Sequence, residues 1–220
     1  NNPTGKILPK KLLDSIIQTA KEHDLYVLSD EIYEKYSGHR TKEEWKVKPS
    51  KSILTYGYEK SIIAKSFSKS YAMTGYRIGW TIAEPSIIEK MSKLQALSLT
   101  NVSEPIQYVA LQALKADENT EDVPIIERIE NWLDSLVRTA KDIGLEFIEP
   151  DGAMYLFAKT KYNNFDATKF SEKLLEHGVA IAPGEGFGDY KEFFRITAIN
   201  ETRLMEGMTI LDTVLKELYE

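Results

Sequence analysis

Four side chains near the middle of the sequence have the types and spacing needed to bind a phosphate and an aldehyde. Ser66, Ser68 and Lys69 are close neighbours, and Arg77 follows eight positions after the lysine. A lysine amine condenses with aldehydes to a Schiff base, and an arginine fork with hydroxyl donors suits a phosphate dianion. We therefore expect a site that holds an aldehyde cofactor on Lys69. Lys65 lies inside the preceding strand pattern and is the poorer candidate.

The elements around these residues are those expected of a site in an open α/β sheet. The β-branched, apolar run over 61–67 predicts a strand that leads into a loop, the usual place for function in such sheets. Gly75 and Gly79 allow the backbone to turn tightly. Ser-x-Ser-Lys is frequent among unrelated proteins, however, so the site needs support from elsewhere in the chain.

Three further places in the sequence combine polar side chains with strand or turn patterns. Asp30 ends an apolar strand predicted over 24–30, and Tyr33 follows it, although an aspartate after a strand also fits ordinary turn chemistry. Asn2 opens an Asn-Pro turn. Arg195 lies within an apolar strand pattern over 193–197, where a charged side chain is costly unless it meets an anion.

These four places together resemble one family. The string over 66–80, Ser-Phe-Ser-Lys-Ser-Tyr-Ala-Met-Thr-Gly-Tyr-Arg-Ile-Gly-Trp, resembles the lysine signature of class I/II aminotransferases, the fold-type I enzymes that use pyridoxal phosphate. The Asn-Pro-Thr-Gly turn at 2–5, the Asp-Glu-Ile-Tyr segment at 30–33 and the Phe-Arg pair at 194–195 are similar to further motifs of the same family, in the same order.

The resemblance implies a role for each candidate residue. Lys69 would carry the cofactor as an aldimine and move the α-proton, and Arg195 would bind the substrate carboxylate with its fork. The cofactor would be held at its ring nitrogen, ring oxygen and phosphate by Asn2, Asp30, Tyr33, Ser66, Ser68 and Arg77. Asn2 would also contact the substrate carboxylate.

The resemblance also implies the fold and its division. We expect an α/β chain that corresponds to the C-terminal part of a fold-type I transferase. Residues 1–118 would be the remainder of a large cofactor domain with a mostly parallel sheet flanked by helices. Residues 119–220 would be a bridging helix and a smaller α+β domain. Because the chain begins inside a family motif, we expect it to lack the N-terminal part of such an enzyme.

Two helices are predicted with apolar stripes that should face a core. Apolar residues recur at helical spacing between 123 and 144, at Ile126, Ile129, Leu133, Leu136, Val137 and Ala140. A second helix is predicted to begin at Pro85, with core positions at Ile87, Ile88, Met91, Leu94 and Leu97.

Composition excludes several other classes of protein. The 220 residues carry a net charge of -6 without a basic cluster, which argues against nucleic-acid binding, and no apolar run is long enough to span a membrane. The chain has no cysteine and its three histidines lack metal-ligand spacing, so we expect a cytoplasmic protein without a metal site. The glycines at 184, 186 and 188 fit a dinucleotide loop poorly.

The function expected from the resemblance is transfer of an amino group between an L-amino acid and a 2-oxo acid, by a homodimer with shared active sites. Ser103 stands near the place where some aspartate-specific relatives carry a second carboxylate-binding arginine, so aspartate, aromatic and alanine substrates all stay open. Two alternatives also stay open: a pyridoxal-phosphate-dependent C–S or C–C lyase on the same fold, and a catalytically incompetent fragment that serves only as a structural or dimerisation unit.

Overall fold

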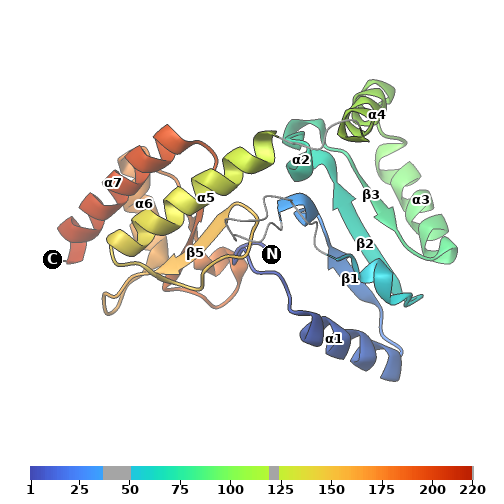
Figure 1. The fold of residues 1–220 in the computed structure, drawn as a ribbon, viewed down its shortest axis with the longest axis horizontal. Helices are drawn as coiled ribbons and strands as arrows, with labels where there is room; N and C mark the ends of the chain where they lie inside the picture. The colour runs from blue at the N-terminus through green and yellow to red at the C-terminus, as the bar shows by residue number, and fades with distance from the viewer. Residues whose placement is uncertain (37–50, 119–123, 220) are drawn as a thin grey trace. The chain divides into compact units, whose positions relative to one another are not determined.

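The computed structural model describes residues 1–36, 51–118 and 124–219, which form two compact units (Figure 1). The described part of the N-terminal unit is 8–36, 51–118 and 124–125. The described part of the C-terminal unit is 126–219 together with the first seven residues, 1–7. Residues 119–123, where the sequence places the domain boundary, lie outside the described residues, so the division into 1–118 and 119–220 stays a prediction.

The N-terminal unit alternates helices with the strands of one sheet. Its elements are α1 (Lys10–Glu22), β1 (Val27–Asp30), the 3-10 turns η1 (Glu34–Tyr36) and η2 (Ile53–Tyr56), β2 (Ser61–Ser66), α2 (Phe67–Ser70), the 3-10 turn η3 (Thr74–Tyr76), β3 (Gly79–Ile82), α3 (Pro85–Leu99) and α4 (Glu104–Glu118). Figure 1 shows α2 directly after β2, so the lysine signature begins where a strand ends.

The sheet of this unit is mixed, which corrects the expectation of a mostly parallel sheet in the described residues. Strand order is β1-β2-β3; β1 pairs with β2 in parallel, whereas β2 pairs with β3 antiparallel. The direction of each pair follows from its connection. A long segment separates β1 from β2 and permits the crossover that parallel strands need, whereas the short segment 67–78 returns the chain directly alongside β2.

The C-terminal unit packs helices on an antiparallel sheet. Its elements are α5 (Pro124–Asp142), β4 (Glu146–Phe147), β5 (Tyr155–Lys159), α6 (Ala167–Glu176), β6 (Ala182–Pro183), the 3-10 turn η4 (Gly184–Phe187), β7 (Phe193–Thr197) and α7 (Glu201–Tyr219). The strand order is β4-β5-β7-β6, and every neighbouring pair is antiparallel, as expected for the α+β part. Of the helices in the described ranges, none has the length and apolar character required to cross a membrane.

The core of the C-terminal unit confirms the stripe predicted on α5. All six of its apolar positions are buried: Ile126, Ile129, Leu133, Leu136, Val137 and Ala140. From Leu133 onward they join a continuous cluster with side chains of β5, α6, β7 and α7, among them the fully buried Leu156, Phe170 and Phe194. Gly144 ends the segment with a positive φ of 77°, a conformation that glycine adopts without strain.

The prediction that the apolar stripe of α3 faces a core is wrong for the described residues. No residue of α3 is buried, and Leu94 and Leu97 are 65% and 85% exposed. The apolar spacing on α3 is real, but among the described residues Ile87 and Ile88 are only half-buried and the rest of the stripe is exposed. A helix buries an apolar stripe only where another element packs against it.

Residues 1–7 are fastened to the turn at 149–152. The carbonyl of Gly5 accepts hydrogen bonds from the backbone N–H groups of Asp151 and Gly152, both at 3.0 Å. Lys6 Nζ lies 2.6 Å from Asp151 Oδ1, and the N–H of Ile7 donates to Asp151 Oδ2 at 3.0 Å. Gly5 has a φ of 67°, and a Cβ there would lie 2.5 Å from the Pro150 Cβ. Only glycine therefore allows this close approach.

One stability prediction concerns the start of α6. Asp166 Oδ1 accepts hydrogen bonds from the N–H groups of Thr168 at 3.0 Å and Lys169 at 3.1 Å, which makes Asp166 an N-cap. We expect Asp166→Ala to lower the free energy of unfolding by about 1 kcal/mol and Asp166→Asn to be nearly neutral. Thermal denaturation measures both. Equal melting temperatures for the alanine variant and the unmodified chain would contradict the capping role.

Candidate functional site

The ends of three strands meet at one edge of the N-terminal sheet. Asp30 ends β1 and Ser66 ends β2, and parallel strands present their carboxyl ends at the same edge. Because β3 runs the other way, its amino end lies at this edge too: Ser66 pairs with Gly79, and Arg77 comes two residues before that glycine. The topology therefore collects Asp30, Ser66 and Arg77 at the place where ligands bind in open α/β sheets.

Ser66 and the short helix α2 fix the position of Lys69. The Ser66 side chain accepts a hydrogen bond from the N–H of Ser68 at 3.0 Å, and its hydroxyl donates to the Ile78 carbonyl at 3.1 Å. Tyr36, which is buried, donates its hydroxyl to the Lys69 carbonyl at 2.8 Å. Tyr36 therefore holds the Lys69 backbone directly, and Ser66 holds the start of the short helix that carries it. Its half-buried ammonium makes no hydrogen bond or ion pair within the described residues.

Arg77 presents its guanidinium from an unusual backbone conformation. Its φ and ψ are 52° and 51°, in the left-handed region that residues other than glycine seldom adopt. Arg77 Nη1 donates to the Thr74 carbonyl at 3.0 Å, and Thr74 in turn donates its hydroxyl to the Ser68 carbonyl at 3.0 Å. These contacts tie the exposed arginine side chain to the segment that carries Ser68.

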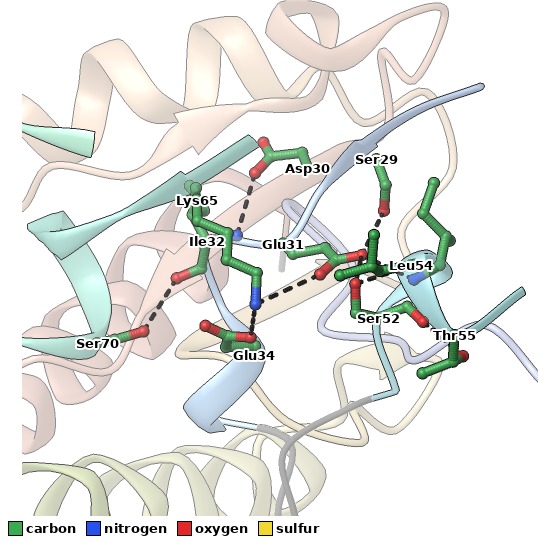
Figure 2. A network of polar contacts seen from close by, with 11 residues as sticks. Ser29, Asp30, Glu31, Ile32, Glu34, Ser52, Leu54, Thr55, Lys65 and Ser70 are labelled. Atoms are coloured by element: carbon green, nitrogen blue, oxygen red, sulfur yellow. Dashed lines mark hydrogen bonds and ion pairs between the residues drawn. The ribbon is translucent and has the colours of Figure 1, made fainter. Parts of the chain in front are cut away.

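Asp30 is exposed at the sheet edge, whereas the carboxylate of Glu31 is bonded to the segment that contains Ser52 and Ile53. Asp30 Oδ1 accepts from the N–H of Ile32 at 3.2 Å, a local turn contact that leaves the rest of the carboxylate available. Glu31 instead accepts hydrogen bonds from the Ser52 hydroxyl and from the backbone N–H of Ile53. Figure 2 shows the contact with Ser52. Tyr33 is half-buried in the turn that follows.

Arg195 and Asn2 meet within the C-terminal unit. Arg195 Nη1 donates to Asn2 Oδ1 at 2.8 Å, although 193 positions separate the two residues. The docking of residues 1–7 on the 149–152 turn explains how they come together. The resemblance assigns both side chains to the substrate carboxylate, and this contact places them side by side.

Two aromatic rings hold the Arg195 guanidinium. Its central carbon lies 4.6 Å from the centroid of the Tyr155 ring and 5.1 Å from that of Phe187. Arg195 Nε is buried and has no hydrogen-bond partner among the described residues. A buried, unpaired donor on a permanent cation is costly, and a carboxylate ligand would remove that cost.

The structure thus sorts the eight candidate residues into two groups. Six of them belong to the N-terminal unit, and all six lie at or directly after the strand ends of one sheet edge: Asp30, Tyr33, Ser66, Ser68, Lys69 and Arg77. The other two, Asn2 and Arg195, belong to the C-terminal unit. Within each unit the residues that the sequence pointed to lie together.

Comparisons with known proteins agree with this arrangement. Residues 1–211 match the family model "Aminotransferase class I and II". The chain belongs to this family. Its members depend on pyridoxal phosphate. Among curated family members, the chain is 35% identical to an aspartate aminotransferase of Pyrococcus horikoshii and 35% identical to an aromatic-amino-acid aminotransferase of Thermococcus litoralis.

The similarity covers nearly all of this chain and about half of each aminotransferase. The Pyrococcus horikoshii match spans 98% of the chain and 55% of the relative, and the Thermococcus litoralis match spans 99% and 56%. The crystal structure of the aspartate aminotransferase from Thermotoga maritima superposes with a TM-score of 0.84 at 30% identity, over 98% of the chain and 54% of that structure. The chain is therefore an α/β portion of the aminotransferase fold and spans about half the length of the relatives it matches.

The donor set of this aminotransferase chain fits pyridoxal phosphate and an amino acid. At the sheet edge, Lys69, whose ammonium has no partner among the described residues, occurs in the same segment as hydroxyl and guanidinium donors suited to a phosphate. In the C-terminal unit, Arg195 Nε, which has no partner in the described ranges, suits a carboxylate. The residues present are thus compatible with the cofactor on which the family depends.

Sequence reasoning missed one polar network beside the candidate site. Lys65, the poorer lysine candidate of the sequence analysis, forms ion pairs with Glu31 and Glu34 (Figure 2). A signal was present: a lysine inside an apolar strand must find a carboxylate if it is buried. The partner could not be chosen from the sequence, because Glu31 and Glu34 both lie about thirty positions away.

Proposed function

We propose that this chain acts in a pyridoxal-phosphate-dependent aminotransferase, which moves an amino group between an L-amino acid and a 2-oxo acid. The observation that carries the proposal is the sheet edge that combines Asp30, Ser66 and Arg77 with Lys69, whose ammonium has no partner in the part of the chain that the structure describes. Similarity to aspartate and aromatic-amino-acid aminotransferases supports amino acids of those two kinds as substrates.

The residues at the sheet edge would bind the aldehyde and the phosphate of the cofactor, and their positions support these roles. When bound, the cofactor supplies an aldehyde that condenses with amines and a ring that takes up electrons from the α-carbon. Lys69 Nζ would hold the aldehyde end and then carry the α-proton as base and acid. Ser66, Ser68 and Arg77 would bind the phosphate.

Four other residues would bind the ring and the substrate. The Asp30 carboxylate would keep a proton on the ring nitrogen, and the Tyr33 hydroxyl would donate to the ring oxygen. Arg195 would bind the α-carboxylate with its fork. Asn2 Oδ1 accepts a hydrogen bond from Arg195 Nη1 at 2.8 Å, and the Asn2 side chain would contact the ring oxygen and the same carboxylate. Orientation of both partners is the protein's main contribution.

We also propose that the active protein is a homodimer with shared active sites, as the resemblance implies. Light scattering or sedimentation of the chain tests this assignment. A dimer whose dissociation abolishes transamination is the expected result, and a monomer with full activity would contradict it.

Addition of pyridoxal phosphate to the purified chain tests the proposed function. We expect the absorbance of lysine-bound pyridoxal, and reduction with borohydride followed by peptide mass analysis should place the label on Lys69. A 2-oxo acid formed from an amino acid without release of ammonia would support transamination. Ammonia with the oxo acid would support the lyase alternative, and no absorbance change would support a purely structural role.

The variant Asp30→Asn distinguishes the effect of the negative charge of Asp30 from the effect of its hydrogen bond with Ile32. Asp30→Asn retains an oxygen that can accept from the N–H of Ile32 but loses the negative charge. We expect kcat to fall by on the order of 10²- to 10³-fold, as when one preorganised electrostatic contact is removed. Steady-state kinetics and thermal denaturation check this together. An asparagine variant with an unchanged melting temperature and an unchanged kcat would refute the role of the carboxylate.

A further inference from the structure

Lys65 forms ion pairs with two carboxylates, Glu31 and Glu34, which belong to the segment between β1 and the end of η1. Its side chain is 15% exposed, and Nζ forms an ion pair and hydrogen bond with Glu34 Oε2 and lies 3.7 Å from Glu31 Oε2. Figure 2 shows the lysine reaching from β2 to both glutamates. The three charges are largely removed from water, since the glutamate side chains are 8% and 21% exposed.

Glu31 depends on this lysine for one of its two oxygens. Oε1 accepts from Ser29 Oγ at 3.2 Å, Ser52 Oγ at 3.0 Å and the N–H of Ile53 at 3.0 Å. Oε2 is buried and accepts no hydrogen bond from the described residues, so Lys65 supplies its compensating charge. Removing one member of a buried ion pair leaves an uncompensated charge, which is strongly unfavourable.

The two glutamates are close in sequence to the residues proposed to contact the cofactor ring. Asp30 comes directly before Glu31, and Tyr33 lies between Glu31 and Glu34. The turn is also tied to α2, because Ser70 Oγ donates to the Ile32 carbonyl at 3.4 Å. Lys65 therefore contacts both ends of the segment 31–34, which contains Tyr33 and directly follows Asp30, and it does so from the strand that leads to Lys69.

We propose that Lys65 is a positioning residue for the cofactor ring: by pairing with Glu31 and Glu34 it fixes the turn that presents Asp30 and Tyr33. This inference rests on the proposed function, since it assigns the ring contacts to those two residues. A merely stabilising ion pair would affect unfolding without affecting the segment 30–36 selectively. The two possibilities therefore differ in a measurable way.

The test compares Lys65→Met with Lys65→Arg, Glu34→Gln and a matched control, Lys60→Met. Lys60 lies just before β2 and pairs at 2.5 Å with Asp24, whose side chain is 82% exposed, so its loss removes a lysine ion pair without touching the turn. Glu34→Gln is the milder change and serves if Lys65→Met does not fold. The readouts are amide hydrogen exchange of residues 30–36 without cofactor and the affinity for pyridoxal phosphate.

We expect exchange over 30–36 to accelerate in Lys65→Met and, less strongly, in Glu34→Gln, with the remainder of the chain unchanged. The affinity for pyridoxal phosphate should fall by about 10- to 100-fold, the range seen when residues that orient a binding group are removed. Lys65→Arg should recover most of both properties, and Lys60→Met should resemble the unmodified chain.

Two results would overturn the inference. One is exchange over 30–36 that is unchanged, or raised equally everywhere, in both Lys65→Met and Glu34→Gln. The other is that the unmodified chain binds pyridoxal phosphate and that Lys65→Met and Glu34→Gln bind it with the same affinity. Failure of the unmodified chain to bind the cofactor would instead refute the proposed function, so the two failures are distinct.

Discussion

Replacement of Lys69 by alanine is expected to abolish both covalent attachment of pyridoxal and transamination. The half-buried ammonium of Lys69 makes no bond to other described residues, whereas its backbone is held by Tyr36, so the side chain can be removed with little structural loss. Proton transfer by a positioned base alone contributes 10²- to 10⁴-fold, so we expect a loss of at least on the order of 10³-fold in kcat.

Absorbance after addition of pyridoxal phosphate and a transamination assay measure the two effects of Lys69→Ala. Lys93→Ala is the control, because Lys93 is 72% exposed on α3 and pairs only with its helical neighbour Glu89. The control should keep the pyridoxal absorbance and the rate. If Lys69→Ala keeps the absorbance of lysine-bound pyridoxal, another lysine carries the cofactor and the assignment is wrong.

Replacement of Arg195 by alanine should raise KM for the amino acid sharply. The guanidinium is packed against Tyr155 and Phe187, and its buried Nε has no partner among the described residues, so a bound carboxylate would be largely desolvated. Loss of one partner from such a pair costs roughly 2 to 5 kcal/mol in kcat/KM. That range corresponds to a decrease of about 30-fold to several thousand-fold.

Two further variants sharpen the measurement on Arg195. Arg195→Lys keeps the charge but not the two-pronged geometry, so we expect it to recover only part of the loss. Arg203→Ala, at a side chain that is 83% exposed on α7, controls for removal of an arginine from the same unit. An unchanged KM in Arg195→Ala would exclude this residue from carboxylate binding.

Helical periodicity predicted α5 and α3 as helices and a buried stripe on each, but only the α5 stripe is buried. Both helices have the expected bounds and apolar spacing, and the α5 stripe is buried because β5, α6 and α7 supply a surface for it. The α3 stripe has no such surface in the described residues. Periodicity reports which face of a helix is apolar, whereas burial also requires a neighbour that local sequence does not specify.

In the candidate site, too, features set by nearby residues could be predicted from the sequence, whereas contacts between distant segments could not. The strand ends that carry Asp30 and Ser66 follow from apolar runs and turns, and the family motifs point to Lys69, Arg77 and Arg195. The ion pairs of Lys65 and the mixed direction of the sheet depend on which distant segments pair in three dimensions. No spacing within a single element predicts those contacts.

The hydrogen bond between Arg195 and Asn2 has a consequence for the order in which the chain folds. Asn2 is synthesised long before Arg195 and before the 149–152 turn that holds residues 1–7. Since chains are made from the N-terminus at about 5–20 residues per second, the first segment must wait several seconds for its partners. The contact also closes a very long loop, so it belongs to the late steps of folding. The pair of Asn2 and Arg195 would thus be completed only after the elements around Lys69 have been made.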